Sequence, residues 1–282
     1  MSRVINIIKR LVNPRVFLRR LFWRNGFYQS EDRHVFVVGP PRSGTTLMHT
    51  YLKSAVGFWG GDEESGFFSS VDHFDLKAPI MGISRPTQIE LMRGKRSLYH
   101  YFDALVGALK VELGGEGRFV EKTPQHAMYL NKILRHFPNA QVVCMMRDPR
   151  DCFCSAKGNE HIPQRHSVDE YIKYWLECTK SIYECQKRPN VLVVKYEDLV
   201  NDPSVSFKKV GMFLGNVNLD PTDLYVSASK DSRSDKQEFS LLKSPVTSVS
   251  VARWQRDLSS ADQEIILRRA SKYMKCFSYL EQ

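Results

Sequence analysis

The chain has 282 residues, of which 42% are hydrophobic, 11% aromatic and 26% charged. This composition is typical of a globular protein, and the length suffices for one large α/β domain or two small ones. No run of about 18 consecutive apolar residues occurs, so no segment is expected to span a bilayer as a helix.

Most of the net charge of +10 is carried by the first 30 residues. They contain seven basic residues and no acidic one, which leaves a net charge of +3 on the other 252 residues. The body of the chain is therefore not expected to bind nucleic acid. A local basic patch for an anionic ligand is compatible with this balance.

Residues 1–30 are predicted to form a basic amphipathic segment ahead of a single domain at 31–282. The segment lacks the uninterrupted apolar core and the small-residue cleavage site of a signal peptide. Two interpretations stay open: a helix on an anionic membrane surface, or a helix that packs on the domain or on a partner. Pro14 would interrupt one long helix.

Strand and helix patterns then alternate along the chain. Strands are predicted at 34–39, 118–124, 141–148 and 190–199, and helices at 45–56, 126–137 and 168–188. Residues 57–100 are expected to be rich in loops, and the last part helical with a Ser-rich loop between 227 and 250. The alternation predicts a P-loop-like, three-layer α/β fold with a central parallel sheet flanked by helices.

Four polar motifs follow the predicted strands: "GPPRSGTT", "EKTP", "RDPRD" and "KYEDL". Parallel sheets bind ligands beyond the carboxyl ends of their strands. The four motifs are therefore expected to share one cleft.

The first motif, at 39–46, resembles a phosphate-binding loop without its lysine. Gly39, Gly44 and Thr46 match G-x-x-x-x-G-K-[ST], but Thr45 occupies the lysine position. Such a loop presents backbone N–H groups and the positive end of a helix to an anion. Because the lysine serves transfer of a γ-phosphoryl group, we expect a ligand with a shorter 5′ chain. An ordinary strand–turn–helix junction is the alternative.

The stretch "GPPRSGTTLM" resembles the 5′-phosphosulfate loop of sulfotransferases that use 3′-phosphoadenosine 5′-phosphosulfate (PAPS), and residues 34–260 follow that family's order of motifs. The tyrosylprotein, glycosaminoglycan and bacterial branches are the most similar. The resemblance implies metal-independent, in-line transfer of a sulfuryl group to a hydroxyl or amine, with 3′-phosphoadenosine 5′-phosphate (PAP) as product. It also implies cofactor contacts from the loop residues Pro41, Arg42, Ser43, Gly44, Thr45 and Thr46.

The resemblance extends to a 3′-phosphate site in "MMRDPRDCFCSAKG". Arg147 and Ser155 match an arginine at a strand end and a serine eight residues later. A guanidinium pairs bidentately with a phosphate, and a hydroxyl adds a donor. The tyrosylprotein branch has a further arginine where this chain has Asn159, and Lys157 is the candidate to replace it.

Three later matches are implied by the same resemblance. Tyr196 in "VVKYEDL" corresponds to a tyrosine that contacts the nucleotide. In "SVARWQRD", Ser250 and Arg253 correspond to the C-terminal element whose basic residue reaches the cofactor. Lys122 in "FVEKTP" corresponds to the lysine that stabilises the departing bridging oxygen.

The general base is expected in "GGDEESGFF", where related families carry a catalytic glutamate. One alignment with the tyrosylprotein pattern selects Glu63, and another with the glycosaminoglycan pattern selects Glu64. The sequence leaves both open. His73 and His126 are the next candidates.

Six cysteines without CxxC pairs indicate free thiols in a reducing compartment. No metal site is expected, and the location is expected to be cytoplasmic, with peripheral membrane contact if residues 1–30 bind lipid. Two rival classes stay open: a P-loop nucleotide kinase or hydrolase, and a non-catalytic membrane-associated binding module. The acceptor and the oligomeric state are not predicted, although residues 66–115 are expected to shape the acceptor pocket.

Overall fold

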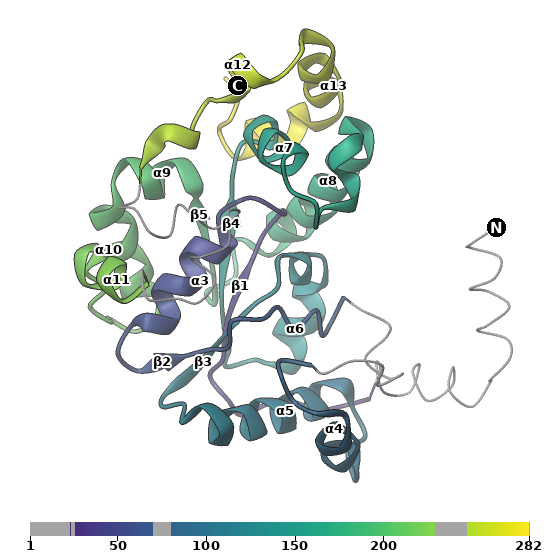
Figure 1. Cartoon of the computed structure of the whole chain (residues 1–282), viewed down its shortest axis with the longest axis vertical. Helices are drawn as coiled ribbons and strands as arrows, with labels where there is room; N and C mark the ends of the chain where they lie inside the picture. Colours follow the sequence, from purple (N-terminus) through teal and green to yellow (C-terminus); the bar gives the residue numbers. More distant parts are fainter. Residues whose placement is uncertain (1–22, 24–25, 70–79, 229–246, 282) are drawn as a thin grey trace, which may run out of the picture.

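A computed structural model of the chain describes Trp23 and residues 26–69, 80–228 and 247–281 (Figure 1). Most of the predicted segment 1–30 and of the predicted Ser-rich loop at 227–250 therefore lies outside the described residues. Within the described part of the chain, no helix is both long and apolar enough to cross a bilayer.

The core of the fold is a sheet of parallel strands in the order β2-β3-β1-β4-β5 (Figure 1). The strands are β1 (Val35–Val38), β2 (Phe58–Trp59), β3 (Arg118–Lys122), β4 (Gln141–Met146) and β5 (Val191–Lys195). Four of them confirm predicted strands, whereas β2 is too short to show a periodic pattern.

Helices cover both faces of this sheet (Figure 1). One face is covered by α3 (Thr45–Ser54), α9 (Tyr196–Asn201), α10 (Pro203–Phe213) and α11 (Pro221–Ala228). The other is covered by α5 (Leu98–Leu113), α6 (Leu130–His136), α7 (Pro149–Lys157), α8 (Val168–Cys185) and α13 (Ser260–Cys276). The short helices α4 (Arg85–Met92) and α12 (Trp254–Asp257) complete the set described. The predicted three-layer α/β fold is confirmed.

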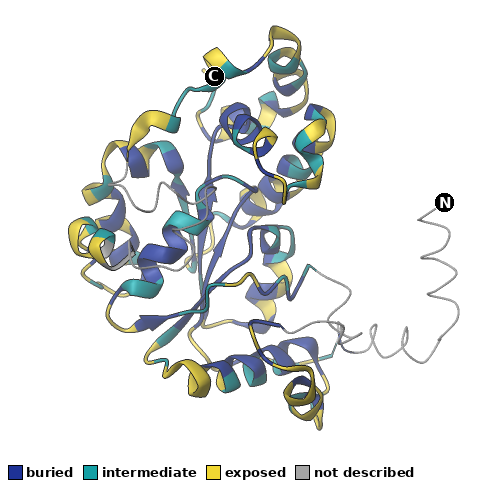
Figure 2. Ribbon diagram, in the orientation of Figure 1, coloured by how far each residue is buried: buried dark blue, intermediate teal, exposed yellow. Residues whose placement is uncertain are grey.

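The central strands are buried on both faces, as the continuous apolar run of β1 requires (Figure 2). Val35 and Val37 pack in the cluster that contains α3 and α10. Phe36 and Val38 point the other way, into the larger cluster formed with α5, α6 and α8. Successive side chains of one strand thus join the two outer layers to the sheet.

Helix α5 was not predicted: residues 57–100 were expected to be rich in loops, and no element was predicted between 101 and 117. The helix begins after Ser97, whose side chain accepts a hydrogen bond from the Tyr99 backbone N–H, and it ends at Gly114 with φ of 62°. Its apolar residues recur at helical spacing and are buried: Leu98, Tyr101, Phe102, Leu105, Val106 and Leu109. Its aromatic residues Tyr99, Tyr101 and Phe102 belong to the hydrophobic core.

Three other elements differ from the prediction in extent. The charged segment after β4 is helix α7, which begins after the capping residue Asp148 with proline at its first position. The predicted strand at 190–199 ends at Lys195, where α9 begins. The predicted helix at 126–137 is a 3₁₀ turn, η2 (Pro124–Tyr129), followed by α6.

At the amino end of the sheet, polar contacts attach the chain before β1 to α5. His34 Nε2 lies 2.9 Å from Asp103 Oδ1, and the Tyr28 hydroxyl donates to Asp103 Oδ2 over 2.6 Å. Trp23 is buried edge-on against Tyr101, with ring centroids 5.9 Å apart. This end lies opposite the loops that follow the strands.

Candidate active site

The motifs at the carboxyl edge of the sheet contact one another directly. Arg147, just after β4, donates to the Arg42 carbonyl over 3.2 Å and to the Ser250 carbonyl over 2.6 Å. Its guanidinium carbon lies 4.3 Å from the ring centroid of Tyr196, at the end of β5. The Gly39 N–H donates to the carbonyl of Pro124 in "EKTP" over 3.3 Å. The shared edge expected from the sequence therefore exists.

The glycine loop needs its glycines for steric reasons. Gly44, the N-cap of α3, has φ of 94°, and a Cβ there would lie 2.6 Å from Cδ2 of Tyr196. A Cβ on Gly39 would lie 2.3 Å from the Met145 carbonyl oxygen. Arg42 itself adopts a left-handed φ of 70°. The backbone is thus packed tightly between the ends of β4 and β5.

The first turn of α3 is suited to an anion. No side chain caps its N–H groups, and the turn contains no acidic residue. Ser43 is fully buried, and its Oγ has no hydrogen-bond partner among the described residues. Thr45 is also buried, while Thr46 is partly exposed. Tyr171 of α8 donates to the Pro41 carbonyl over 2.6 Å and holds the loop from the other side.

Arg147 is a buried cation that retains an unused donor. Arg147 is only 4% exposed, and its Nε has no hydrogen-bond partner among the described residues. The two guanidinium donors that are bonded both go to backbone carbonyls. A guanidinium held in this way can bind an anion without first breaking an ion pair.

The C-terminal element is held against α7 by Asp151. This carboxylate accepts the N–H groups of Ala252 over 2.8 Å and of Trp254 over 3.0 Å. Burial raises the pKa of Asp151, and these hydrogen bonds and Arg147 oppose the shift. The guanidinium of Arg150 lies over the Trp254 ring at 3.7 Å. Trp254 thus packs against Arg150.

Arg253 and Lys157 each form an ion pair with an aspartate in this structure. Arg253 Nε donates to Asp257 Oδ2 over 2.9 Å, and its side chain is one third exposed. Lys157 Nζ lies 3.9 Å from Asp262. Of the two residues predicted from the C-terminal element, Ser250 contacts Arg147 through its carbonyl, whereas Arg253 is paired with Asp257.

Lys122 and Glu64 form an ion pair beside the glycine loop. Lys122 Nζ donates to Glu64 Oε1 over 2.5 Å. The lysine side chain is 3% exposed and that of the glutamate 42%, so the pair lies at the boundary between protein and solvent. Glu63 is exposed and has no ion pair among the described residues. Asp62, the third acid of the loop, pairs with Lys53 of α3. Of the three acids of this loop, Glu64 is the one that pairs with the predicted lysine.

His126 is not available as a base in this arrangement. It is fully buried, and its Nε2 accepts the Phe68 backbone N–H over 3.0 Å. Its Nδ1 lies 3.0 Å from Glu121 Oε2. Both ring nitrogens are engaged. The other candidate, His73, lies outside the described residues.

The sequence analysis missed two polar residues near the Lys122–Glu64 pair. Tyr174 of α8 is within hydrogen-bonding reach of Gln125, and burial, with the nearby Cys178 and Glu64, raises its pKa well above the ordinary value. Gln125 Oε1 is buried without a partner among the described residues. Tyr174 lies in the predicted helix at 168–188, and Gln125 directly follows "EKTP". The sequence pattern does not show that α8 packs next to η2, so it could not bring these two residues together.

Comparison with known proteins identifies the family. A family model described as "Sulfotransferase family" matches residues 34–219. The chain is 26% identical over 201 residues to a Caenorhabditis briggsae protein named as a protein-tyrosine sulfotransferase, covering 65% of each chain. The sulfotransferase domain of the Synechococcus PCC 7002 olefin synthase shares the fold, with a TM-score of 0.68 and 17% identity over 92% of this chain and 99% of that one.

A mouse sulfotransferase solved in complex with PAP also shares the fold, with a TM-score of 0.56 and 14% identity over 88% of this chain and 86% of that one. The family match covers β1 to β5 and the loops at their carboxyl ends up to residue 219. It therefore includes the glycine loop, Lys122, Arg147 and Tyr196. The chain belongs to the sulfotransferase family.

Proposed function

We propose that the protein transfers a sulfuryl group from PAPS to a hydroxyl or amine of an acceptor. The observation that carries this proposal is the position of the Lys122–Glu64 pair beside a lysine-free glycine loop that is joined to Arg147. This combination offers an anion site and a proton-transfer site at one edge of the sheet.

The residues present fit PAPS. The uncapped first turn of α3, with Arg42, Ser43, Thr45 and Thr46, is suited to the 5′-phosphosulfate. The orphaned Oγ of Ser43 and the tight approach at Gly44 support a bound anion there. The mouse relative with the same fold was solved with PAP. We assign Pro41 to the same loop as a backbone contributor.

The 3′-phosphate is assigned to Arg147 and Ser155, with Tyr196 and the C-terminal residues Ser250 and Arg253 beside the nucleotide. Nε of Arg147 has no hydrogen-bond partner in the described part of the chain, and its neighbour Tyr196 contributes an aromatic face. Arg253 would have to leave Asp257 to reach the nucleotide. The ion pair of these two residues is partly exposed, so breaking it costs little free energy.

We assign the two catalytic roles, general base and stabilisation of the leaving oxygen, to Glu64 and Lys122. When bound, PAPS supplies the sulfuryl group. Glu64 takes the proton of the acceptor oxygen or nitrogen, which then forms a bond to sulfur while the bond from sulfur to the bridging oxygen breaks. Lys122 stabilises the negative charge that develops on that oxygen. Their 2.5 Å contact supports this assignment, because two groups that are so close can act on the same reacting atoms.

The two rival classes are less well supported. A P-loop kinase or hydrolase would need a lysine at Thr45 and an aspartate free to bind Mg²⁺. Asp148, after β4, instead pairs with Arg150 through both carboxylate oxygens. A non-catalytic membrane module would leave the Lys122–Glu64 pair and the arginine cluster without a role.

Thermal shift with three ligands tests the proposal: PAP, ATP with Mg²⁺, and anionic liposomes. Stabilisation by PAP at concentrations where ATP–Mg²⁺ has little effect is expected. Preference for ATP–Mg²⁺ would favour a kinase or hydrolase, and a response to liposomes alone would favour a membrane module. An acceptor screen with labelled PAPS then identifies the substrate class.

A further inference from the structure

The loop that follows Glu64 is anchored by three consecutive backbone amides. The Gly66 N–H donates to Thr123 Oγ1 over 3.0 Å, and the Phe67 N–H donates to Ser65 Oγ over 3.2 Å. The Phe68 N–H donates to His126 Nε2 over 3.0 Å. Two hydroxyls and one imidazole therefore accept the amides of residues 66–68.

All three acceptors meet the same carboxylate, Glu121 of β3. Thr123 Oγ1 and Ser65 Oγ donate to Oε1 of Glu121 over 2.6 and 2.7 Å. His126 Nδ1 lies 3.0 Å from Oε2. A single side chain thus connects the strand that carries Lys122 to the loop that carries Glu64.

The proton positions in this network follow from its chemistry. A backbone N–H can only donate, so Thr123, Ser65 and His126 each use a lone pair on an amide and turn their own proton toward Glu121. His126 is consequently neutral and carries its proton on Nδ1. Glu121 accepts every hydrogen bond that reaches it and must be ionised.

The charge state of Glu121 agrees with this assignment. The residue is only 2% exposed, and burial by itself raises a carboxyl pKa. The hydrogen bonds from His126, Ser65 and Thr123 oppose burial, and they hold the pKa of Glu121 below its ordinary value. The carboxylate is therefore charged at neutral pH although it lies in the protein interior.

We propose that Glu121 is a positioning residue that holds the loop 65–68, and through it the carboxylate of Glu64, at the geometry needed beside Lys122. Glu64 immediately precedes the anchored loop, and Lys122 immediately follows Glu121 in β3. The inference rests on the proposed function, in which Glu64 is the base. Displacement of a reacting group by about 1 Å can cost about 100-fold in rate.

Glutamine cannot replace Glu121 in this role, although it has the same shape. Its amide presents N–H donors at one of the two positions where the carboxylate accepts. The NH₂ group of the glutamine would face either the Ser65 and Thr123 hydroxyls or the Nδ1–H of His126. If His126 moved its proton to Nε2 to avoid this conflict, that proton would face the Phe68 N–H. Each arrangement therefore either opposes two donors or forces the Ser65 and Thr123 hydroxyls to turn their protons away from residue 121 and lose that acceptor.

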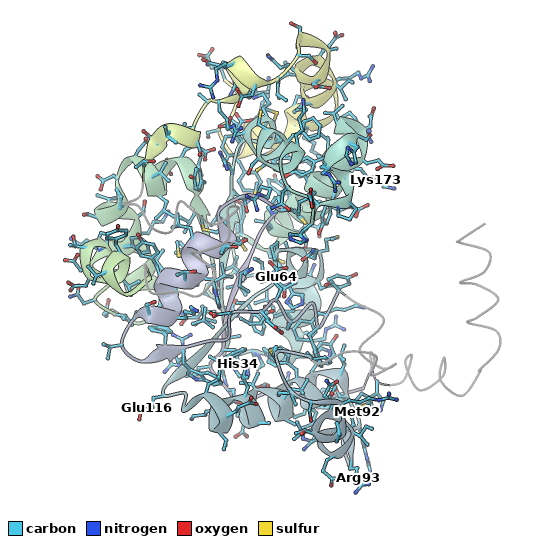
Figure 3. The ribbon with its side chains drawn as sticks, in the orientation of Figure 1. His34, Glu64, Met92, Arg93, Glu116 and Lys173 are labelled. Atoms are coloured by element: carbon cyan, nitrogen blue, oxygen red, sulfur yellow. The ribbon has the colours of Figure 1, made fainter. Side chains whose placement is uncertain are left out.

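Glu121→Gln should be compared with Glu116→Gln, the same change at an exposed acid before the amino end of β3. Figure 3 shows Glu116 at the periphery of the view, away from Glu64. Amide hydrogen exchange of peptides covering residues 65–69 is expected to accelerate at least tenfold in Glu121→Gln. The glycine loop should keep its protection, and Glu116→Gln should match the wild type.

Turnover supplies the functional readout. With an acceptor from the screen, or with water as acceptor, kcat of Glu121→Gln should fall about 10- to 100-fold, while the Kd for PAP stays within twofold of the wild type. Faster exchange with kcat equal to that of Glu116→Gln would make Glu121 merely structural and overturn the proposal. Unchanged exchange would overturn the anchor itself.

Two further comparisons keep the test decisive. If Glu121→Gln does not fold, Thr123→Val removes one relay hydroxyl and should reproduce the faster exchange and a smaller loss of kcat, whereas Thr123→Ser should restore both. If Glu64→Gln retains full turnover, the assignment of Glu64 as base fails. In that case faster exchange in Glu121→Gln still establishes the anchor, so the two failures are distinguishable.

Discussion

Arg42 and Ser155 lie 113 positions apart in the chain, yet Nε of Arg42 donates to Oγ of Ser155 over 3.0 Å. The contact joins the loop after β1 to helix α7, which follows β4. We assigned these two segments to the 5′ and 3′ ends of one nucleotide. A ligand with phosphates at both positions would therefore bind across two segments that already touch.

The first prediction is that the protein binds PAP far more tightly than ADP, because ADP lacks the 3′-phosphate assigned to Arg147 and Ser155. Loss of a charge-assisted contact of this kind costs about 2–3 kcal/mol, or about 30- to 150-fold in Kd. Calorimetry measures both constants. Arg147→Lys should abolish most of the difference, while Arg256→Lys, at an exposed arginine of α12, should preserve it. Equal affinities in the wild type would contradict the assignment.

Activity should also survive chelation. The positive charge needed at the bridging oxygen is assigned to Lys122, so no divalent ion is required for that step. Turnover in excess EDTA should stay within twofold of the untreated enzyme, as measured by release of labelled PAP. Loss of activity on chelation, restored by added Mg²⁺ or Zn²⁺, would place the protein in another mechanistic class.

The Glu121 network predicts a specific pH dependence of stability. Its folded pKa lies below the ordinary value near 4.5, so the stabilisation is fully present above the pKa of the unfolded chain and is lost as pH falls through the folded pKa. Urea unfolding from pH 7 to pH 3 should show the advantage of the wild type over Glu121→Gln shrinking below about pH 4.5. A difference that stays constant over this range would argue against an ionised Glu121.

Ala252 allows a test of the C-terminal element. It has a left-handed φ of 57° while its N–H is bonded to Asp151. This conformation costs a residue with Cβ about 1–2 kcal/mol, but glycine loses more backbone entropy on folding. Ala252→Gly should therefore leave the free energy of unfolding unchanged or raise it by up to about 1 kcal/mol, and Ala252→Val should lower it. Chemical unfolding decides; destabilisation by glycine and tolerance of valine would refute the reasoning.

Much of this architecture could be predicted because the relevant signals are local. Apolar runs of this length such as "QVVCMM" are typical of buried strands, and parallel strands must present their carboxyl ends at one edge. The glycine loop was recognisable because φ above zero and close backbone approach at Gly44 restrict the residue type. These constraints act within a few residues and leave a pattern in the sequence.

The remainder depends on contacts between distant segments. Glu63 and Glu64 are adjacent and chemically equal, and only the approach of β3 distinguishes them. The same holds for His126, whose lone pair is used by the Phe68 N–H, and for Arg253, whose nearest acid is Asp257, one helical turn away. Helix α5 is different, because its helical spacing was present in the sequence but was obscured by the aromatic and glycine content around it.

The last prediction separates the two glutamates. If Glu64 takes the acceptor proton, Glu64→Gln should lower kcat by about 10²- to 10⁴-fold and bind PAP normally, because the carboxylate acts on the acceptor and not on the nucleotide. Glu63→Gln, at the exposed neighbour without an ion pair among the described residues, should retain kcat within about threefold and serves as the matched control.

Lys122→Ala should slow turnover too, but it does not by itself identify the base, because the ammonium contacts Glu64 and is also assigned to the bridging oxygen of PAPS. The double variant Glu64→Gln with Lys122→Ala resolves this. Since the two side chains form one unit, the double variant should lose little more kcat than the worse single variant. Additive losses would mean that the pair does not act together, and full activity in Glu64→Gln with a large loss in Glu63→Gln would transfer the role to Glu63.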